Sequence, residues 1–186
     1  MALGDPYVTA EELKARLGIE DESDNTEIGS AVVAASSAVN RFCRRQFHKA
    51  AVPSPRSYTT TGDGLLLVDD FHTTVGLVVG GAAYSADAVA LEPENGVVDG
   101  EPGWPFWRIY GSGLSGRVTV TAAWGWAAIP GPVVEATYMT AIEIFKMRDA
   151  PFGVQGMADF GLIRIRENAR TNSLLNPYRR HAVVVA

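Results

Sequence analysis

Apolar residues recur with a helical period over the first quarter of the chain. Thr9-Ala-Glu-Glu12 has the form of a capping box, and Gly18 supplies the left-handed residue that ends a short helix. Asp24-Asn-Thr-Glu27 repeats the capping signal. Behind it, apolar residues fall at steps of four and three: Ile28, Val32, Ala35, Val39 and Phe42. This stripe predicts a helix of about five turns. Small residues fill the rest of its first half and would let another helix approach closely.

From Tyr58 to Ala128 the pattern changes to strands and turns. The clearest strand is residues 117–126, where one face carries only apolar residues: Val118, Val120, Ala122, Trp124 and Trp126. Strict alternation predicts a half-buried antiparallel strand. Residues 107–110 are its expected hairpin partner, through the glycine-rich residues 111–116. Two further strands are expected at 65–68 and 75–79, the second running into a hairpin turn at Gly80-Gly81.

Pro130-Gly-Pro132 predicts the start of a second long helix, since proline suits a first turn. Its core stripe consists of Val134, Tyr138, Ala141 and Phe145. Four more apolar residues leave little of the remaining surface polar: Val133, Met139, Ile142 and Ile144. A helix that is apolar on nearly every side must be covered on nearly every side. We therefore expect these four residues to form an interface with a neighbouring subunit.

The last fifth of the chain has too few apolar side chains to form a core alone. A glycine-punctuated segment after Pro151 precedes a short helical stretch, residues 167–175, and a tail that ends in an apolar run. The predicted fold is α+β: mainly a helical bundle of two long helices plus short ones, with an inserted antiparallel β region and an extended C-terminal tail. Its segments are N-terminal helices (1–52), β region (53–129), second long helix (130–150) and C-terminal arm (151–186).

Composition indicates an ordinary globular protein of 186 residues, 47% hydrophobic and 20% charged. We expect it to be soluble, without a signal peptide, because no window approaches the roughly 18 apolar residues of a membrane span. The lone Cys43 allows no internal disulfide and is expected to be buried. With three scattered histidines it offers no metal-ligand spacing, so we expect no metal and no cofactor.

The net charge of −5 conceals an uneven distribution. Between Tyr58 and Ala128, eight acidic residues face only Arg108 and Arg117. After Phe160 the balance reverses, with five arginines opposed by Glu167. Arg41, Arg44 and Arg45 suit the negative end of the first long helix. An acidic middle and a basic end can attract copies of the same chain or an acidic partner, because complementary fields steer association.

Motifs that suggest catalysis are weak. Asp159-Phe-Gly161 matches a kinase tripeptide, but the other kinase motifs are missing. Asp69 and Asp70 could ligate a cation or act as an acid and base pair, yet neighbours on a strand point to opposite faces. A charged turn after Val68 is the preferred interpretation. No serine has a nucleophile elbow, so we expect no enzyme.

Tryptophans allow a second function. Trp104 and Trp107 flank Pro105-Phe106, which we expect on an exposed loop, where indoles could stack on sugars or a peptide. Trp124 and Trp126 share a face with Val118 and are expected in the core. An aromatic-faced glycan- or peptide-binding module is therefore the alternative function.

Five motifs, in this order, resemble those of a known family: Tyr7-Val-Thr-Ala-Glu-Glu-Leu13, Val39-Asn-Arg-Phe-Cys-Arg-Arg-Gln-Phe47, Val68-Asp-Asp-Phe71, a Trp-rich strand before Ile129-Pro130, and Leu174-Leu-Asn-Pro-Tyr-Arg-Arg180. The chain resembles the head-to-tail connector (adaptor) proteins of long-tailed bacteriophages (siphophages), especially those of actinobacterial hosts. The resemblance spans nearly the whole chain.

This resemblance implies a structural protein of the virion neck, made in the host cytoplasm. It implies a twelve-membered ring beneath the portal protein, with a stopper or tail-completion protein on the far side, DNA passing through without sequence-specific binding, and no membrane. The C-terminal segment would bind the portal through Tyr178, Arg179, Arg180, Val183, Val184 and Val185, by adding a strand to a sheet edge. Asp69, Asp70, Trp104 and Trp107 would face the channel or the stopper.

Overall fold

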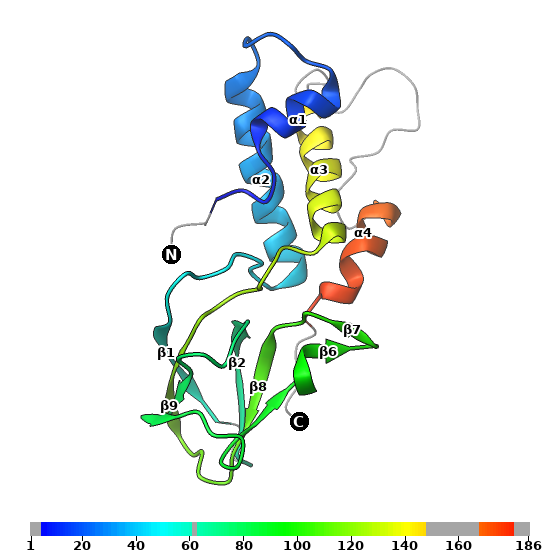
Figure 1. Ribbon diagram of the computed structural model, residues 1–186. Coiled ribbons are helices and arrows are strands. Elements are labelled where there is room, and N and C mark those ends of the chain that lie inside the picture. The colour runs from blue at the N-terminus through cyan, green and yellow to red at the C-terminus, as the bar shows by residue number, and fades with distance from the viewer. Residues whose placement is uncertain (1–4, 61–62, 148–167, 181–186) are drawn as a thin grey trace. The chain divides into compact units, whose positions relative to one another are not determined.

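A computed structural model describes residues 5–60, 63–147 and 168–180. The chain divides into two units, which we call the helical unit (residues 1–45 and 129–186) and the β unit (residues 46–128). The fold is α+β, with four α-helices and antiparallel sheets in the described ranges (Figure 1). The expectation of a mainly helical bundle is not confirmed, because the sheets make up a substantial part of the structure.

Helix α1, Ala10–Leu17, is capped as its sequence predicts. The Glu12 N–H donates to Thr9 Oγ1 at 3.1 Å, and the Thr9 N–H donates to Glu12 Oε2 at 2.8 Å. Gly18 ends the helix with φ of 68°. The Arg16 guanidinium holds α1 on the later helix α3, since it pairs with Glu135 at 2.8 Å and lies 3.8 Å from the ring centroid of Tyr138.

Helix α2, Asn25–Cys43, has the predicted length and core stripe, but its start differs from the prediction. Asp24 precedes the helix as predicted, but its side chain makes no cap hydrogen bond, so the predicted capping interaction is absent. Ile28, Val32, Ala35 and Val39 are buried, whereas Phe42 is only partly buried. Cys43 is fully buried, as expected. Arg44 ends the helix in the left-handed region, with φ of 54°.

Helix α3, Gly131–Lys146, runs antiparallel to α2 (Figure 1) and buries its predicted stripe against it, except that Val134 is only partly buried. The shared core contains Ile28, Ala31, Val32 and Ala35 from α2 and Tyr138, Ala141 and Phe145 from α3. Helix α4, Ala169–Leu175, leads into the 3₁₀ turn η4, Asn176–Tyr178. The Asn168 side chain accepts hydrogen bonds from the N–H groups of Arg170 and Thr171, which caps α4. None of the helices in the described ranges is long and apolar enough to cross a bilayer.

The β unit contains nine short strands and one 3₁₀ turn in its described residues: β1 (Ser54–Thr59), β2 (Leu65–Phe71), β3 (Val78–Val79), β4 (Ala82–Ala83), β5 (Ala90–Glu92), η1 (Glu94–Gly96), β6 (Val97–Val98), β7 (Glu101–Pro102), β8 (Phe106–Tyr110) and β9 (Arg117–Ala122). They form a four-stranded sheet in the order β1-β9-β3-β4, a three-stranded sheet in the order β2-β8-β5, and the hairpin β6-β7. All pairings are antiparallel.

Local pairing was predicted better than distant pairing. The hairpin at Gly80-Gly81 is confirmed: Val79 faces Ala82, and both glycines have positive φ. The predicted partner of β9 is wrong, because β9 pairs with β1 and β3, whereas β8 pairs with β2 and β5. The apolar face is confirmed for Val118, Val120 and Ala122, which belong to the core of the β unit. The predicted extent to residue 126 is wrong, because β9 ends at Ala122, and Trp124 joins the same core from beyond the strand.

A close backbone approach fixes the two ends of the β unit. The Ala50 N–H donates to Trp124 O at 2.8 Å, and the Gly125 N–H donates to Asp70 O at 2.6 Å. Gly125 has φ of 92°, and a Cβ added there would lie 1.6 Å from His48 O. Only glycine therefore fits at this position.

Replacing Gly125 with alanine is expected to prevent normal folding of the β unit. The matched control is Gly81→Ala, which has a similar φ of 89° but nothing within 4 Å of the added Cβ. Backbone strain alone should cost the control about 1–2 kcal/mol. Urea unfolding followed by tryptophan fluorescence measures both, and equal losses would contradict the steric argument.

Candidate functional site

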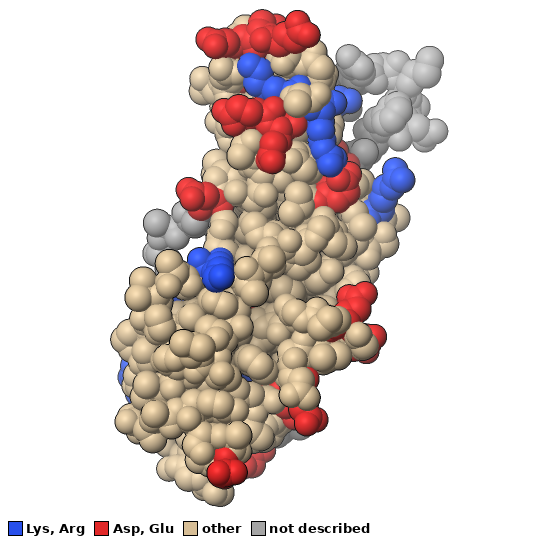
Figure 2. All heavy atoms as spheres, viewed as in Figure 1, with Lys and Arg blue, Asp and Glu red and all other residues tan. Residues whose placement is uncertain are grey.

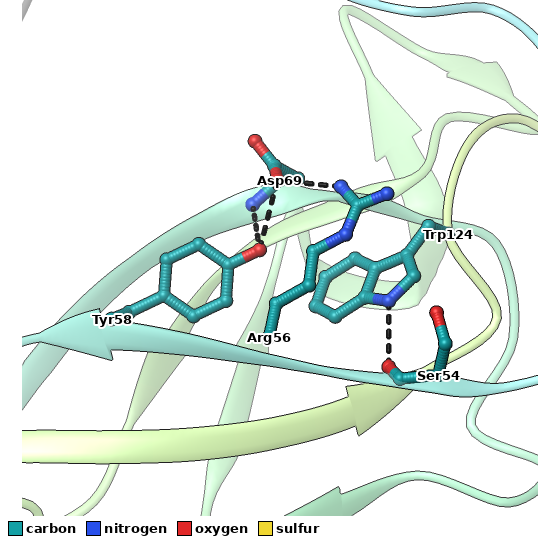
Figure 3. A network of polar contacts seen from close by, with 5 residues as sticks. All are labelled: Ser54, Arg56, Tyr58, Asp69 and Trp124. Carbon is teal, nitrogen blue, oxygen red and sulfur yellow. Dashed lines mark hydrogen bonds and ion pairs between the residues drawn. The ribbon is translucent and has the colours of Figure 1, made fainter. Parts of the chain in front are cut away.

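A polar network on the β unit joins side chains of β1 and β2 (Figure 3). The Arg56 Nη1 group donates to Asp69 Oδ2 at 2.6 Å, and the Tyr58 hydroxyl donates to the same oxygen at 2.9 Å. The Asp69 N–H in turn donates to the Tyr58 hydroxyl oxygen at 3.3 Å. Burial is the main cause that raises the pKa of Tyr58, and the nearby Asp69 carboxylate raises it further.

Trp124 completes the network. Its Nε1–H donates to Ser54 O at 2.7 Å, and its ring lies 4.6 Å from the Arg56 guanidinium carbon (Figure 3). A cation over an indole face is attracted by the ring quadrupole. Arg56 is therefore held between an aromatic face and a carboxylate.

This network connects two sheets that share no strand. β1 belongs to the four-stranded sheet and β2 to the three-stranded sheet. The register of β2 against β8 shifts between Leu67 and Phe71, which frees the backbone near Asp69 for Tyr58. Side-chain hydrogen bonds thus join these two sheets, as backbone hydrogen bonds join the strands within one sheet. Arg56 and Tyr58 both donate to Asp69 Oδ2, so the network links the two sheets through side-chain hydrogen bonds.

The two neighbouring aspartates lie on opposite faces, as strand geometry predicts. They belong to strand β2, so the preferred interpretation of a charged turn is wrong. Asp69 is half exposed, at 52% of its side chain, whereas Asp70 is buried and accepts a hydrogen bond from Trp126 Nε1 at 3.1 Å. They cannot act together as an acid and base pair.

The tryptophans form an internal cluster instead of an exposed face. Trp104 is only 9% exposed and packs on Trp126, with ring centroids 5.1 Å apart. Phe47 lies 5.2 Å from Trp126, and both Trp124 and Trp126 are buried as expected. The exposed loop predicted around Trp104 is therefore wrong, and residues 106–110 form β8. Trp107 stays partly exposed. Of the described tryptophans, a ligand could therefore stack only on this indole, which is too little for an aromatic binding face.

The segment after α4 binds the end of α2. Tyr178 is buried, the Arg179 guanidinium carbon lies 5.4 Å from the ring centroid of Phe42, and the Arg180 N–H donates to Cys43 O at 2.8 Å. Burial raises the pKa of the Cys43 thiol to about 12, with Arg45 and Arg179 acting in the opposite direction. Val183, Val184 and Val185 lie outside the described residues.

The four apolar residues predicted at a subunit interface are not equivalent in the structure. Val133 is fully buried within its own chain. Met139, Ile142 and Ile144 are partly exposed. The interface prediction therefore rests on these three residues, and Val133 belongs to the core.

Groups that could support catalysis have structural roles where they are described. Ser36 accepts a hydrogen bond from the Tyr7 N–H and donates to Val32 O. Within the described ranges, no three His, Cys, Asp or Glu side chains are placed to hold a metal ion. Asp159-Phe-Gly161 lies outside those ranges.

Sequence analysis missed Arg56 and Tyr58. Both lie on one face of the short strand β1, and their alternation with exposed neighbours was a detectable signal. Pro53 and Pro55 obscured it, because prolines usually interrupt strands.

Comparison with known proteins identifies structural neighbours only. No protein-family model and no curated protein matches the chain. One chain from the neck of an empty gene transfer agent particle, computed with C6 symmetry, has a TM-score of 0.58 at 18% identity and covers 100% of this chain and 96% of its own length. A chain from the virion of a native gene transfer agent particle has a TM-score of 0.48 at 15% identity, covering 97% and 93%. The first comparison shows a shared fold over the whole length.

A double-mutant cycle on Arg56→Ala and Asp69→Ala tests the network. Both side chains are partly exposed (29% and 52%), so solvent screening limits the expected coupling to about 1 kcal/mol. The Arg108–Glu92 pair is the matched control, because it is similarly exposed but joins strands that already pair. Its coupling, measured by urea unfolding, should be smaller. Equal couplings would show that the network does not hold the two sheets together.

Proposed function

We propose that this protein is a structural component of a phage-like virion neck, a head-to-tail connector (adaptor) that forms a ring beneath the portal. The observation that carries this proposal is the fold, which is shared over the full length with a neck chain of a gene transfer agent particle. The ordered motifs of the sequence point to the same family independently.

The internal use of reactive side chains supports a structural role. In the described residues, Asp69, Asp70, Ser36 and Cys43 are all engaged in holding the fold. A connector needs surfaces that bind other chains, and it needs no catalytic centre.

The proposed ring brings α3 against a neighbouring copy through Met139, Ile142 and Ile144. The C6 symmetry used for the similar neck supports a copy number that is a multiple of six, and we propose twelve. Phage DNA would pass through the ring without sequence-specific binding. A stopper or tail-completion protein would bind the side opposite the portal.

The proposed portal contact is the C-terminal segment. Tyr178 and Arg180 hold it on α2, so that Arg179 and residues 183–185 can reach the portal. On the β unit, Asp69 and Trp107 are accessible enough to face the channel or the stopper. Asp70 and Trp104 would support that surface from within.

Two substitutions on α3 separate an interface from a core. Met139→Glu is expected to leave the fold intact and to weaken self-association, because Met139 is partly exposed and a carboxylate there would be buried between copies. Val133→Glu is the control and is expected to unfold the helical unit, since Val133 is fully buried in one chain. Circular dichroism and sedimentation velocity measure the two effects. Unfolding by Met139→Glu would place that residue in the core instead.

Removing residues 181–186 is expected to preserve the fold and prevent attachment to portal-containing capsids. The physical reason is that buried Leu175 and Tyr178 already anchor the end of α4 in the core. Co-sedimentation with purified capsids measures attachment, and thermal unfolding checks the fold. Normal attachment of the shortened protein would contradict the proposed portal contact.

A further inference from the structure

Arginines from two distant parts of the chain meet at the C-terminal end of α2. Arg41 and Arg44 are exposed there, and Arg179 is held at the same helix end by its contact with Phe42. The bond from the Arg180 N–H to Cys43 O fixes this arrangement. We call Arg41, Arg44 and Arg179 the arginine surface.

The helix dipole explains only part of this gathering. Cations at a helix C-terminus are favoured within the last turn, which accounts for Arg41 and Arg44. Arg179 comes from a separate segment and adds to the like charge. Neither sequence segment supplies a carboxylate, since residues 28–60 and 168–180 contain no Asp or Glu. Mutual repulsion of this kind favours binding of an anionic partner.

The β unit carries the complementary charge. Residues 57–107 contain eight acidic residues and no Lys or Arg. Asp69, Asp70 and Glu92 bind groups of the β unit itself. Three others are exposed on one small substructure, η1 with the hairpin β6-β7: Glu94, Asp99 and Glu101.

We call this substructure the acidic hairpin, because it exposes three carboxylates to solvent. Its turn at Asp99-Gly100 has φ of 51° and 83°, the left-handed pair typical of a tight hairpin. Val97 lies among the carboxylates and is 40% exposed. Acidic side chains lie over this region in Figure 2. An apolar residue with a charged rim is a typical protein contact.

We propose that in the ring the acidic hairpin of one copy binds the arginine surface of the next copy. This inference rests on the proposed ring. Rings form when two different patches on each copy bind head to tail, and these two patches differ in charge and in position along the chain. The contact pairs carboxylates of the acidic hairpin with the guanidinium groups of Arg41 and Arg44, while Arg179, proposed above to face the portal, adds positive charge to the surface.

The covalent connections between the two units favour the acidic hairpin as the partner of the arginine surface, in preference to a second acidic cluster. The β unit is covalently joined to the helical unit at residues 45–46 and 128–129, next to the arginine end of α2. This second acidic cluster lies on the loop before α2, at the opposite end of the helical unit (Figure 2). That cluster is separated from the arginine surface of its own copy by α2, whose 19 residues span about 28 Å.

Charge reversal with rescue tests the contact. One variant combines Arg41→Glu with Arg44→Asp, where aspartate suits the left-handed backbone. The other combines Glu94→Arg with Glu101→Arg. Each alone is expected to associate at least about ten-fold more weakly at low salt, because like charges then face each other. An equimolar mixture should regain association, since alternating copies again match at every interface.

Two control variants change the net charge by the same amount as the test variants, but at other positions. Glu20→Arg with Glu22→Arg, and Arg117→Glu with Arg170→Glu, alter exposed residues elsewhere and should associate like the wild type. Arg179 is left unchanged so that capsid attachment, which tests the proposed function, can be scored separately. Sedimentation velocity measures association, and circular dichroism confirms folding.

Single-cysteine variants show whether the contact lies between copies. Tagged Glu101→Cys and untagged Arg41→Cys, each with Cys43→Ala, are mixed and oxidised. A disulfide-linked heterodimer is the expected product, because each chain carries one thiol. A chain bearing both cysteines that closes on itself at high dilution would overturn the inference and assign the contact to a single copy.

Other outcomes are equally decisive. If all variants associate like the wild type but capsid attachment is normal, the inference fails and the proposed function stands. If the wild type stays monomeric at low salt, where opposite charges attract most strongly, the inference also fails. Loss of 30-bp duplex DNA binding in the arginine variant, with association intact, would assign the arginine surface to DNA. A wild type that never attaches to capsids would overturn the proposed function.

Discussion

The pairing of β1 with β9 is the constraint on which the rest of the structure depends. The chain leaves the helical unit after α2 and returns to it before α3, with the whole β unit in between. Ser54 faces Ala122, the Ala50 N–H donates to Trp124 O, and His48 O packs on Gly125, so the two connections are held together. The end of α2 and the start of α3 therefore stay close, and the two helices can share one core although they are distant in sequence.

The charged and aromatic residues of the β unit are used mainly to close it. Asp69 bridges two sheets, Asp70 fixes Trp126, and Trp104 fills the space beside Trp126. A buried carboxylate needs hydrogen bonds to offset the loss of water, and the Trp126 indole N–H supplies one to Asp70. Side chains that suggest catalysis in the sequence are thus committed to the fold. The carboxylates that remain exposed lie where a partner can reach them.

Features that depend on residues close in sequence were predicted better than contacts between residues far apart in sequence. The capping box at Thr9, the stripe from Ile28 to Val39 and the turn at Gly80-Gly81 depend on neighbours within a few residues, and they were predicted correctly. The partner of β9 was not, because a glycine-rich loop favoured the adjacent residues 107–110 over the distant, proline-containing β1. The contact of Arg180 with Cys43 and the burial of Trp104 are equally non-local. The interface residues stay a prediction, and the structure shows only that periodicity marks Val133 and Ile142 as apolar without telling that its own chain fully buries Val133.

Segregated charge also bears on which assembly the chain can form. A two-fold pair joined at the arginine surface of both copies would place guanidinium against guanidinium. The acidic hairpin would repel itself in the same way. A head-to-tail contact avoids both repulsions and leaves one unmatched patch of each sign at the two ends of an open chain of copies. Closing the ring joins those last two patches, so charge complementarity favours closure over an open chain of copies.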